Sequence, residues 1–246
     1  MPPSVRTPRS DSRSPTPGAP ESARVRSMFD GIAHRYDLLN HLLSFQMDRL
    51  WRRRAALAAT RGLVRPRVLD LCAGTGDLAR AVLDVAKSGS VFAADFSLEM
   101  LARAARKDQR LRLAGADALK LPFRAGSFDV VTAAFGVRNF SDRAAGFSEI
   151  RRVLRPGGRF VMLEFTPPGP GFVGSACRFY SRTVLPRVGA FLSRDPAAYR
   201  YLPESVDRFP GAEDLRGELM RAGFRRVDFE RFAFGTVALH CASLDG

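Results

Sequence analysis

The sequence is poor in cysteine and lysine and has no long apolar run. Its three cysteines, Cys72, Cys177 and Cys241, are odd in number and far apart, which argues against a disulfide framework or a zinc site and indicates a reducing compartment. No apolar stretch approaches the roughly 20 residues that a membrane-spanning helix needs, and the N-terminal residues lack the apolar core of a signal peptide. We therefore expect a cytoplasmic globular protein without a metal site.

Arginine accounts for almost all of the positive charge. Of the 39 basic residues only Lys87, Lys107 and Lys120 are lysines, and the formal net charge is +14. The codon usage of a GC-rich genome produces such a bias. The functional alternative is attraction to nucleic acid, an acidic lipid surface or an anionic substrate. Because the arginines are scattered and no basic helix stands out, codon usage is the favoured interpretation.

Residues 1–23 differ in composition from the rest of the chain. Proline, serine and arginine dominate them, and they offer almost nothing to bury, so we expect a disordered basic leader. One domain is expected over residues 24–246. At its start, apolar residues recur at helical spacing from Met28 to Leu43 and predict two or three helices within residues 24–61.

Strands and helices then alternate along the chain. The pattern predicts five strands, over residues 67–72, 90–95, 111–115, 128–135 and 159–165. Helices are predicted over residues 77–86, 98–107 and 143–154, the last one stopped by Pro156–Gly158. A helix over residues 213–222 precedes an antiparallel hairpin of two strands, 224–231 and 236–241. This order predicts an α/β doubly wound, mostly parallel seven-stranded sheet with an antiparallel C-terminal hairpin and a helical N-terminal cover.

The first strand-to-helix turn carries the residues of a nucleoside site. Gly74 and Gly76 let a ligand approach the backbone, and the helix that follows offers free N–H groups. Asp95 ends the next strand, where a carboxylate accepts both hydroxyls of a ribose. A helix N-cap is the structural alternative for Asp95. Asp117 and the backbone N–H of Ala118 follow the third strand and suit an adenine ring.

Several segments resemble known methyltransferases. The class I S-adenosylmethionine-dependent enzymes are matched by Asp70-Leu-Cys-Ala-Gly-Thr-Gly-Asp77, Leu121-Pro-Phe123 and Val153-Leu-Arg-Pro-Gly-Gly158. The chain further resembles the menaquinone/ubiquinone C-methyltransferase family in Phe135-Gly-Val-Arg-Asn139, Val161-Met-Leu-Glu-Phe165, Tyr199-Arg-Tyr-Leu-Pro-Glu-Ser205 and Val237-Ala-Leu-His240. The resemblance runs from about residue 25 to residue 241 and implies methylation of a ring carbon of a prenylated quinol.

The resemblance also implies which residues hold S-adenosylmethionine. Thr75, Asp95, Asp117 and Ala118 occupy the family's cofactor positions, and Ala134 stands where some members have serine. The segment over residues 203–210 looks more like demethylmenaquinone enzymes than ubiquinone ones. Methylation of a ubiquinone precursor is therefore the alternative, and a non-catalytic S-adenosylmethionine-binding protein is a second one. Such a protein would be expected to have lost Asp95 or the glycines, and both are present.

The expected chemistry needs a ring carbon made nucleophilic by loss of a hydroxyl proton. A base or a water relay and donors to the phenolate are therefore required. Arg138 and Asn139, just past the fourth strand, are candidates for stabilising the phenolate or ordering water. His34 and Tyr36, in the N-terminal helices, are candidates for acid–base work, although a surface histidine and a core tyrosine explain them equally well.

The partners follow from this substrate. Residues 167–210 are rich in apolar side chains and are expected to cover the quinol, with a helix pair packed on the sheet as the structural alternative. A prenylated quinol implies transient contact with the inner face of the membrane. No nucleic-acid partner is expected, because the Asn-Pro-Pro-Tyr type of signature is missing after the fourth strand. Self-association is left open.

Overall fold

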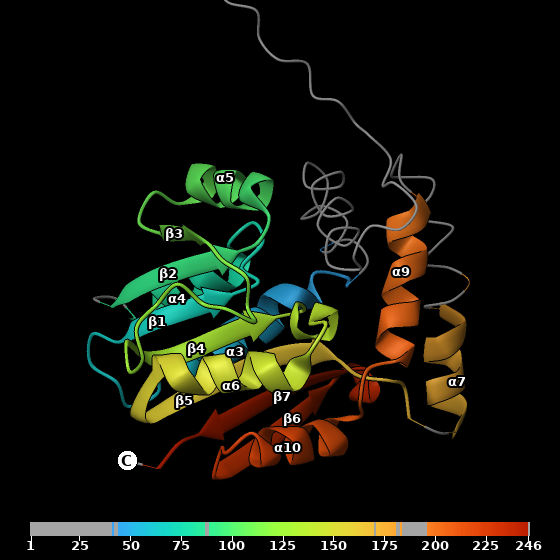
Figure 1. The fold of residues 1–246 in the computed structure, drawn as a ribbon. Coiled ribbons are helices and arrows are strands. Elements are labelled where there is room, and N and C mark those ends of the chain that lie inside the picture. Colours follow the sequence, from blue (N-terminus) through green and yellow to red (C-terminus); the bar gives the residue numbers. More distant parts are fainter. Residues whose placement is uncertain are drawn as a thin grey trace, which may run out of the picture.

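Seven strands form one sheet in the order β3-β2-β1-β4-β5-β7-β6 (Figure 1). The structure is a computed structural model, and it describes residues 41, 44–86, 89–169, 171–180, 183 and 196–245. The strands are β1 (Arg67–Leu71), β2 (Ser90–Asp95), β3 (Arg112–Gly115), β4 (Phe128–Ala134), β5 (Leu154–Phe165), β6 (Arg226–Phe232) and β7 (Val237–Ser243). The first five pair in parallel, and β7 pairs antiparallel with both β5 and β6. The predicted fold class and C-terminal hairpin are confirmed.

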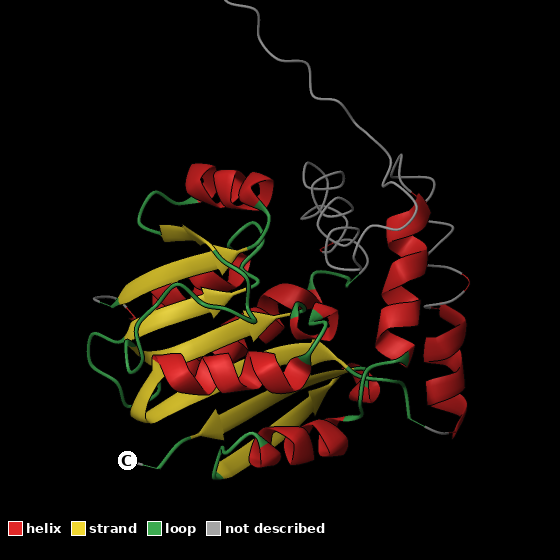
Figure 2. Ribbon diagram, in the orientation of Figure 1, coloured by secondary structure: helices red, strands yellow, loops and turns green. Residues whose placement is uncertain are grey.

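Helices cover both faces of this sheet (Figure 2). They are α3 (Met47–Thr60), α4 (Asp77–Ala86), α5 (Leu98–Lys107), α6 (Arg143–Val153), α7 (Gly171–Phe179), α9 (Pro196–Asp207) and α10 (Ala212–Arg221), with short 3-10 turns η1 (Val137–Asn139) and η3 (Ala233–Gly235). The predicted bounds of α4 and α5 are confirmed to the residue, since each is a strongly amphipathic run. None of the helices within the described ranges is long and apolar enough to cross a bilayer.

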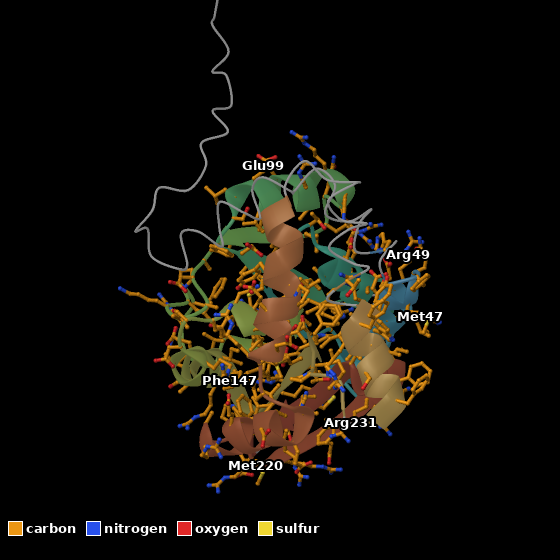
Figure 3. The ribbon with its side chains drawn as sticks, turned by 90° about the vertical axis from the view of Figure 1, so that its right-hand side faces the viewer. Met47, Arg49, Glu99, Phe147, Met220 and Arg231 are labelled. Carbon is orange, nitrogen blue, oxygen red and sulfur yellow. The ribbon has the colours of Figure 1, made fainter. Side chains whose placement is uncertain are left out.

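Successive side chains of a strand point to opposite faces of the sheet, so the core consists of two layers, one on each face. Leu69 of β1 packs with α6 and α10 on one face, while Val68 packs with α3 and α4 on the other. Figure 3 views the carboxyl edge of the parallel strands and shows Phe147 of α6 and Met47 of α3 on opposite sides. Both faces of the parallel strands are therefore covered, and ligands have access at the strand ends.

One predicted boundary is wrong by more than two residues. The fifth strand begins at Leu154, not at residue 159, so Pro156–Gly158 lie within β5. The cause is pairing with the far end of the chain: Gly157 donates a hydrogen bond to the carbonyl of Asp245, and Leu244 donates to that of Gly158. The predicted leader over residues 1–23, and half of the predicted helical region over residues 24–61, lie outside the described residues. Within residues 24–61 the structure describes α3.

Two helices stand apart from both layers. The chain leaves β5 at the carboxyl edge of the sheet and forms α7 and α9 there (Figure 1). In the described part of residues 167–210 these helices stand beside the strand ends, and α9 contacts η1, the turn that follows β4. The segment expected to cover the substrate thus begins and ends at the edge where ligands bind.

Candidate active site

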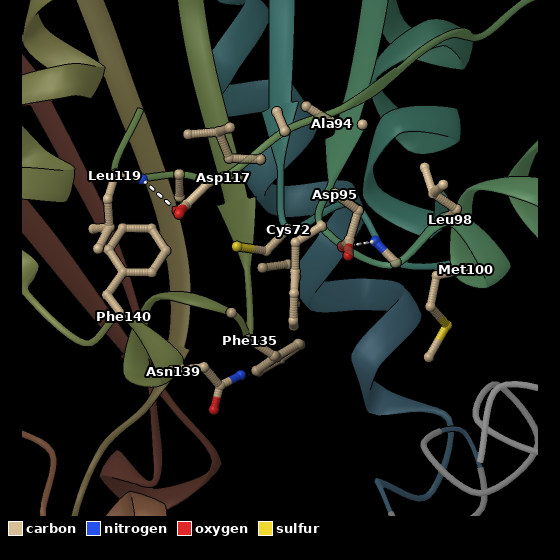
Figure 4. A pocket seen from close by; sticks show the side chains of 18 of the residues that line it. Cys72, Ala94, Asp95, Leu98, Met100, Asp117, Leu119, Phe135, Asn139 and Phe140 are labelled. Carbon is tan, nitrogen blue, oxygen red and sulfur yellow. Dashed lines mark hydrogen bonds between the residues drawn. The ribbon is translucent and has the colours of Figure 1, made fainter. Parts of the chain in front are cut away.

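A cavity of about 630 Å³ opens at the carboxyl ends of β1, β2 and β4 (Figure 4). Its walls combine backbone and carboxylate groups with apolar side chains. They include Gly74 from the first loop, Asp95 and Phe96 at the end of β2, Asp117 and Ala118 after β3, and Ala134, Gly136, Asn139 and Phe140 at the end of β4 and in the loop that follows. Five of the predicted cofactor residues, namely Gly74, Asp95, Asp117, Ala118 and Ala134, therefore line one cavity.

Asp95 ties the first loop to the end of β2. Its Oδ2 accepts a hydrogen bond from the Gly74 N–H at 2.8 Å, and its Oδ1 accepts one from the Ser97 N–H at 2.9 Å. Ser97, rather than Asp95, caps α5, because its hydroxyl accepts from the Met100 N–H. The alternative of a helix cap for Asp95 is therefore excluded. The carboxylate is almost buried yet lines the cavity, so it faces the space that a ligand would occupy.

Asp117 lies at the other end of the cavity. Its Oδ1 accepts a hydrogen bond from the Leu119 N–H at 2.9 Å (Figure 4), which makes a tight turn after β3. The side chain is exposed, and the next residue, Ala118, also lines the cavity. Together with the apolar side chain of Phe140, this end of the cavity suits a flat, polar-edged ring. Together the carboxylates, backbone groups and aromatic ring supply the kinds of contact that a nucleoside needs.

Thr75 and Gly76 support the loop from behind. The Thr75 side chain is buried, and its hydroxyl accepts a hydrogen bond from Lys107 Nζ at 2.8 Å; the same ammonium binds Asp77 Oδ1 at 2.7 Å. Gly76 has a φ of +83°, and a Cβ there would crowd Ala104 of α5. Neither residue lines the cavity wall. Their predicted direct contact with the cofactor stays a prediction.

A second carboxyl group is buried beneath the first loop. Asp70 in β1 is 1% exposed, and its Oδ1 accepts a hydrogen bond from the Thr132 hydroxyl at 2.6 Å. Burial raises the pKa of Asp70 to about 7, and the bond from Thr132 offsets only part of that effect. Burial also raises the pKa of the neighbouring Cys72 thiol, so Cys72 stays a neutral wall of the cavity and not a nucleophile.

The loop after β4 is fixed by a buried ion pair. Arg138 Nη1 lies 3.1 Å from Glu164 Oε1, and the Arg138 backbone N–H donates to Glu164 Oε2. Glu164 is fully buried, which raises its pKa despite the guanidinium. Arg138 also donates to the Phe135 carbonyl. Its side chain is 5% exposed and points to Glu164, so the predicted catalytic arginine lies behind the cavity wall.

Asn139 is one of two polar residues of this loop, with Ser141, that line the cavity. Its Oδ1 accepts a hydrogen bond from the Tyr201 hydroxyl of α9 at 2.9 Å, which leaves its amide N–H groups for a ligand. Sequence reasoning missed the roles of Tyr201 and Glu164. The signal for Glu164 is one acidic residue in the otherwise apolar run from Phe160 to Phe165, whereas nothing local indicates the partner of Tyr201.

Two predicted catalytic residues, His34 and Tyr36, lie outside the described residues. Among the side chains that the structure does describe, no three histidine, cysteine, aspartate or glutamate residues gather as metal ligands.

Comparison with known proteins identifies the family. The model of the ubiE/COQ5 methyltransferase family matches residues 19–243. A demethylmenaquinone methyltransferase of Thermus thermophilus is 49% identical over 217 residues, covering 87% of this chain and 98% of that protein. The enzyme of the same name from Deinococcus radiodurans is 46% identical over 219 residues, covering 87% of this chain and 90% of that protein.

Solved structures agree on the fold. An S-adenosylmethionine-dependent methyltransferase from Aquifex aeolicus superposes with a TM-score of 0.59 at 16% identity, covering 84% of this chain and 96% of that one. One from Thermotoga maritima superposes with a TM-score of 0.60 at 17% identity, covering 88% and 98%. The chain belongs to the ubiE/COQ5 methyltransferase family and is an S-adenosylmethionine-dependent methyltransferase.

Proposed function

We propose that this enzyme transfers the methyl group of S-adenosylmethionine to a ring carbon of demethylmenaquinol and so forms menaquinol. The observation that carries the proposal is the 49% identity to the Thermus thermophilus enzyme over nearly its whole length, combined with a cavity whose walls suit a nucleoside. Methylation of a ubiquinone precursor is the second candidate, because a 43% identical relative from Syntrophotalea carbinolica is named a ubiquinone/menaquinone biosynthesis C-methyltransferase.

The cavity residues divide the work of holding S-adenosylmethionine. Asp95 accepts hydrogen bonds from the ribose hydroxyls, the backbone of Gly74 lies against the amino-acid part, and Asp117 with Ala118 meets the adenine edge. The small side chain of Ala134 leaves space in the cavity for the cofactor. Thr75 and Gly76 hold the first loop in place through Lys107 and α5. This division is supported by the placement of each residue around one cavity.

The bound S-adenosylmethionine supplies a methyl group that is already activated, so the chain's own task is to orient the quinol and stabilise its phenolate. Asn139 supplies a hydrogen-bond donor for the phenolate. Its Oδ1 accepts from the Tyr201 hydroxyl, so its amide N–H groups stay available. Arg138 adds a positive charge from behind the wall, partly neutralised by Glu164. His34 and Tyr36 remain the proposed acid–base residues.

A matched set of variants tests the catalytic assignment. Tyr36→Phe should lower turnover by about 10²–10³ while S-adenosylmethionine affinity holds. Arg138→Met combined with Glu164→Gln should lower it less, because Arg138 does not line the cavity. The double change avoids leaving a buried carboxylate unpaired. Wild-type turnover in both variants would remove these residues from the mechanism.

Paired substrates test the proposed reaction. Purified enzyme with S-adenosylmethionine is given reduced demethylmenaquinone or 2-methoxy-6-polyprenyl-1,4-benzoquinol, and products are followed by mass spectrometry. We expect faster methylation of the naphthoquinol. Preference for the benzoquinol would establish the ubiquinone alternative, and binding of S-adenosylmethionine without any methylation would establish the non-catalytic one.

We also propose a place for this reaction. The enzyme works in the cytoplasm and meets its prenylated substrate at the inner membrane surface, without a nucleic-acid partner and without a metal. The positive net charge of +14 supports attraction to anionic lipid headgroups. We expect the binding of the enzyme to anionic lipid to be weak, reversible and reduced by salt.

A further inference from the structure

Four phenylalanine side chains are exposed on the described part of the chain, and they come from three separate segments. Phe45 precedes α3 and is 75% exposed, Phe172 and Phe179 belong to α7 and are 89% and 64% exposed, and Phe234 in η3 is 85% exposed. Single exposed apolar residues are common on protein surfaces. Four large aromatic rings are unusual, because each leaves a large apolar area in water.

These segments meet at one corner of the molecule. The Phe45 ring lies 6.3 Å from that of Tyr180, the residue that follows α7. At the other end, Thr166 leads from β5 toward α7, and its hydroxyl donates to the carbonyl of Gly235 in η3 at 2.6 Å. Figure 3 shows α7 between Met47 at the start of α3 and Arg231 just before η3. We call Phe45, Phe172, Phe179 and Phe234 the phenylalanine face.

Two members of the phenylalanine face have an unfavourable backbone conformation. Phe45 has a φ of +52° and Phe234 a φ of +55°, a left-handed region that a bulky side chain rarely adopts. Packing in a core would compensate for such strain, but both rings are exposed. Backbone strain at an exposed side chain indicates that the side chain contacts a binding partner.

Positive charge and further apolar groups surround this face. Along α3, Met47, Leu50 and Leu57 form one exposed stripe, and exposed Arg49 and Arg53 lie on the same helix. α7 contains no acidic residue and has Arg178 in its last turn. Arg231 is exposed next to η3. The exposed Glu230 precedes Arg231, and Arg54 pairs with it at 3.2 Å.

We propose that the phenylalanine face docks on an anionic lipid surface. The rings enter the interface between headgroups and acyl chains, and the surrounding arginines meet lipid phosphates. The inference rests on the proposed function, since a prenylated quinol resides in the bilayer. The face adjoins the carboxyl edge of the sheet, where the cavity opens and α9 contacts η1. Docking there brings the site next to the membrane, so that the ring of the quinol enters while its tail stays in lipid.

The test replaces the aromatic rings and compares them with apolar residues elsewhere. In full-length protein, Phe45, Phe172, Phe179 and Phe234 are all changed to serine. The control changes three exposed apolar residues of other surfaces, Val64→Ser, Leu113→Ser and Met220→Ser. Calorimetry of S-adenosylmethionine binding checks that both variants are folded. Flotation then measures binding to phosphatidylcholine vesicles with and without phosphatidylglycerol.

We expect the wild type and the control to bind the anionic vesicles alike, and the quadruple variant to bind about tenfold more weakly or worse. The quadruple variant should methylate a water-soluble, short-chain demethylnaphthoquinol at the wild-type rate but lose turnover with quinol embedded in vesicles. Arg49→Gln with Arg53→Gln should weaken binding mainly at low salt.

Equal vesicle binding by the quadruple variant would overturn the proposal. So would sedimentation of the wild type as a dimer that the quadruple variant abolishes, since the face would then pair two copies of the chain. If the wild type fails to methylate the water-soluble quinol, the proposed function fails, while the vesicle measurement still decides the docking face by itself.

Discussion

Replacing Asp95 with asparagine changes one side-chain oxygen to an amino group and tests whether the cavity binds S-adenosylmethionine. The two carboxylate oxygens accept from the backbone N–H groups of Gly74 and Ser97, at 2.8 and 2.9 Å. Asparagine is nearly isosteric, but its amino group must face one of these donors. The change removes a charge-assisted bond to the backbone and at least one to a ribose hydroxyl, each worth about 1.5–3 kcal/mol.

From these magnitudes, S-adenosylmethionine affinity should fall at least about tenfold, and the free energy of unfolding should fall by about 1.5–3 kcal/mol. Calorimetry measures the first and urea denaturation the second. Asp84→Asn is the matched control, because it removes the same charge from the exposed end of α4, where Asp84 pairs with Arg110 at 3.2 Å. An unchanged affinity in folded Asp95→Asn protein would refute the reasoning.

Three further predictions follow from the same region. A Cβ at Gly136 would overlap that of Cys72, so Gly136→Ala should lower the free energy of unfolding by about 1–3 kcal/mol, measured by thermal denaturation, and Cys72→Gly should restore it. Tyr201→Phe frees Asn139 and should lower kcat up to about tenfold with unchanged S-adenosylmethionine affinity, as steady-state kinetics and calorimetry will show. The folded-state pKa of Asp70 is raised from 3.8 to about 7, so its contribution to stability is fully present below pH 4 and is lost as pH rises through 7. Urea unfolding of Asp70→Asn should therefore show the variant gaining roughly 4 kcal/mol relative to wild type between pH 4 and pH 8, and parallel pH profiles would contradict the raised pKa.

The parts predicted best from the sequence are those that local pattern controls. The bounds of α4 and α5 follow from amphipathic runs, and the parallel order of β1, β2 and β4 follows from the alternation of strands and helices. The place of Asp95 was predictable for the same reason, because parallel strands end at one edge.

The parts that failed or were missed depend on distant residues. The early start of β5 needs Gly157 and Asp245, far apart in the chain, to pair. The ion pair of Arg138 with Glu164 was missed, because it depends on the register of β4 against β5, which brings Glu164 within reach of the guanidinium. Local sequence does not encode such register.

The position of the transferred methyl group tests the central claim most directly. Purified enzyme is incubated with S-adenosylmethionine carrying a ¹³C-labelled methyl group and with reduced demethylmenaquinone, and the product is examined by NMR. The account predicts the labelled methyl on the free ring carbon of the naphthoquinol, with S-adenosylhomocysteine formed in equal amount. Label on a ring oxygen, or no label in the quinone while S-adenosylmethionine binds, would contradict it.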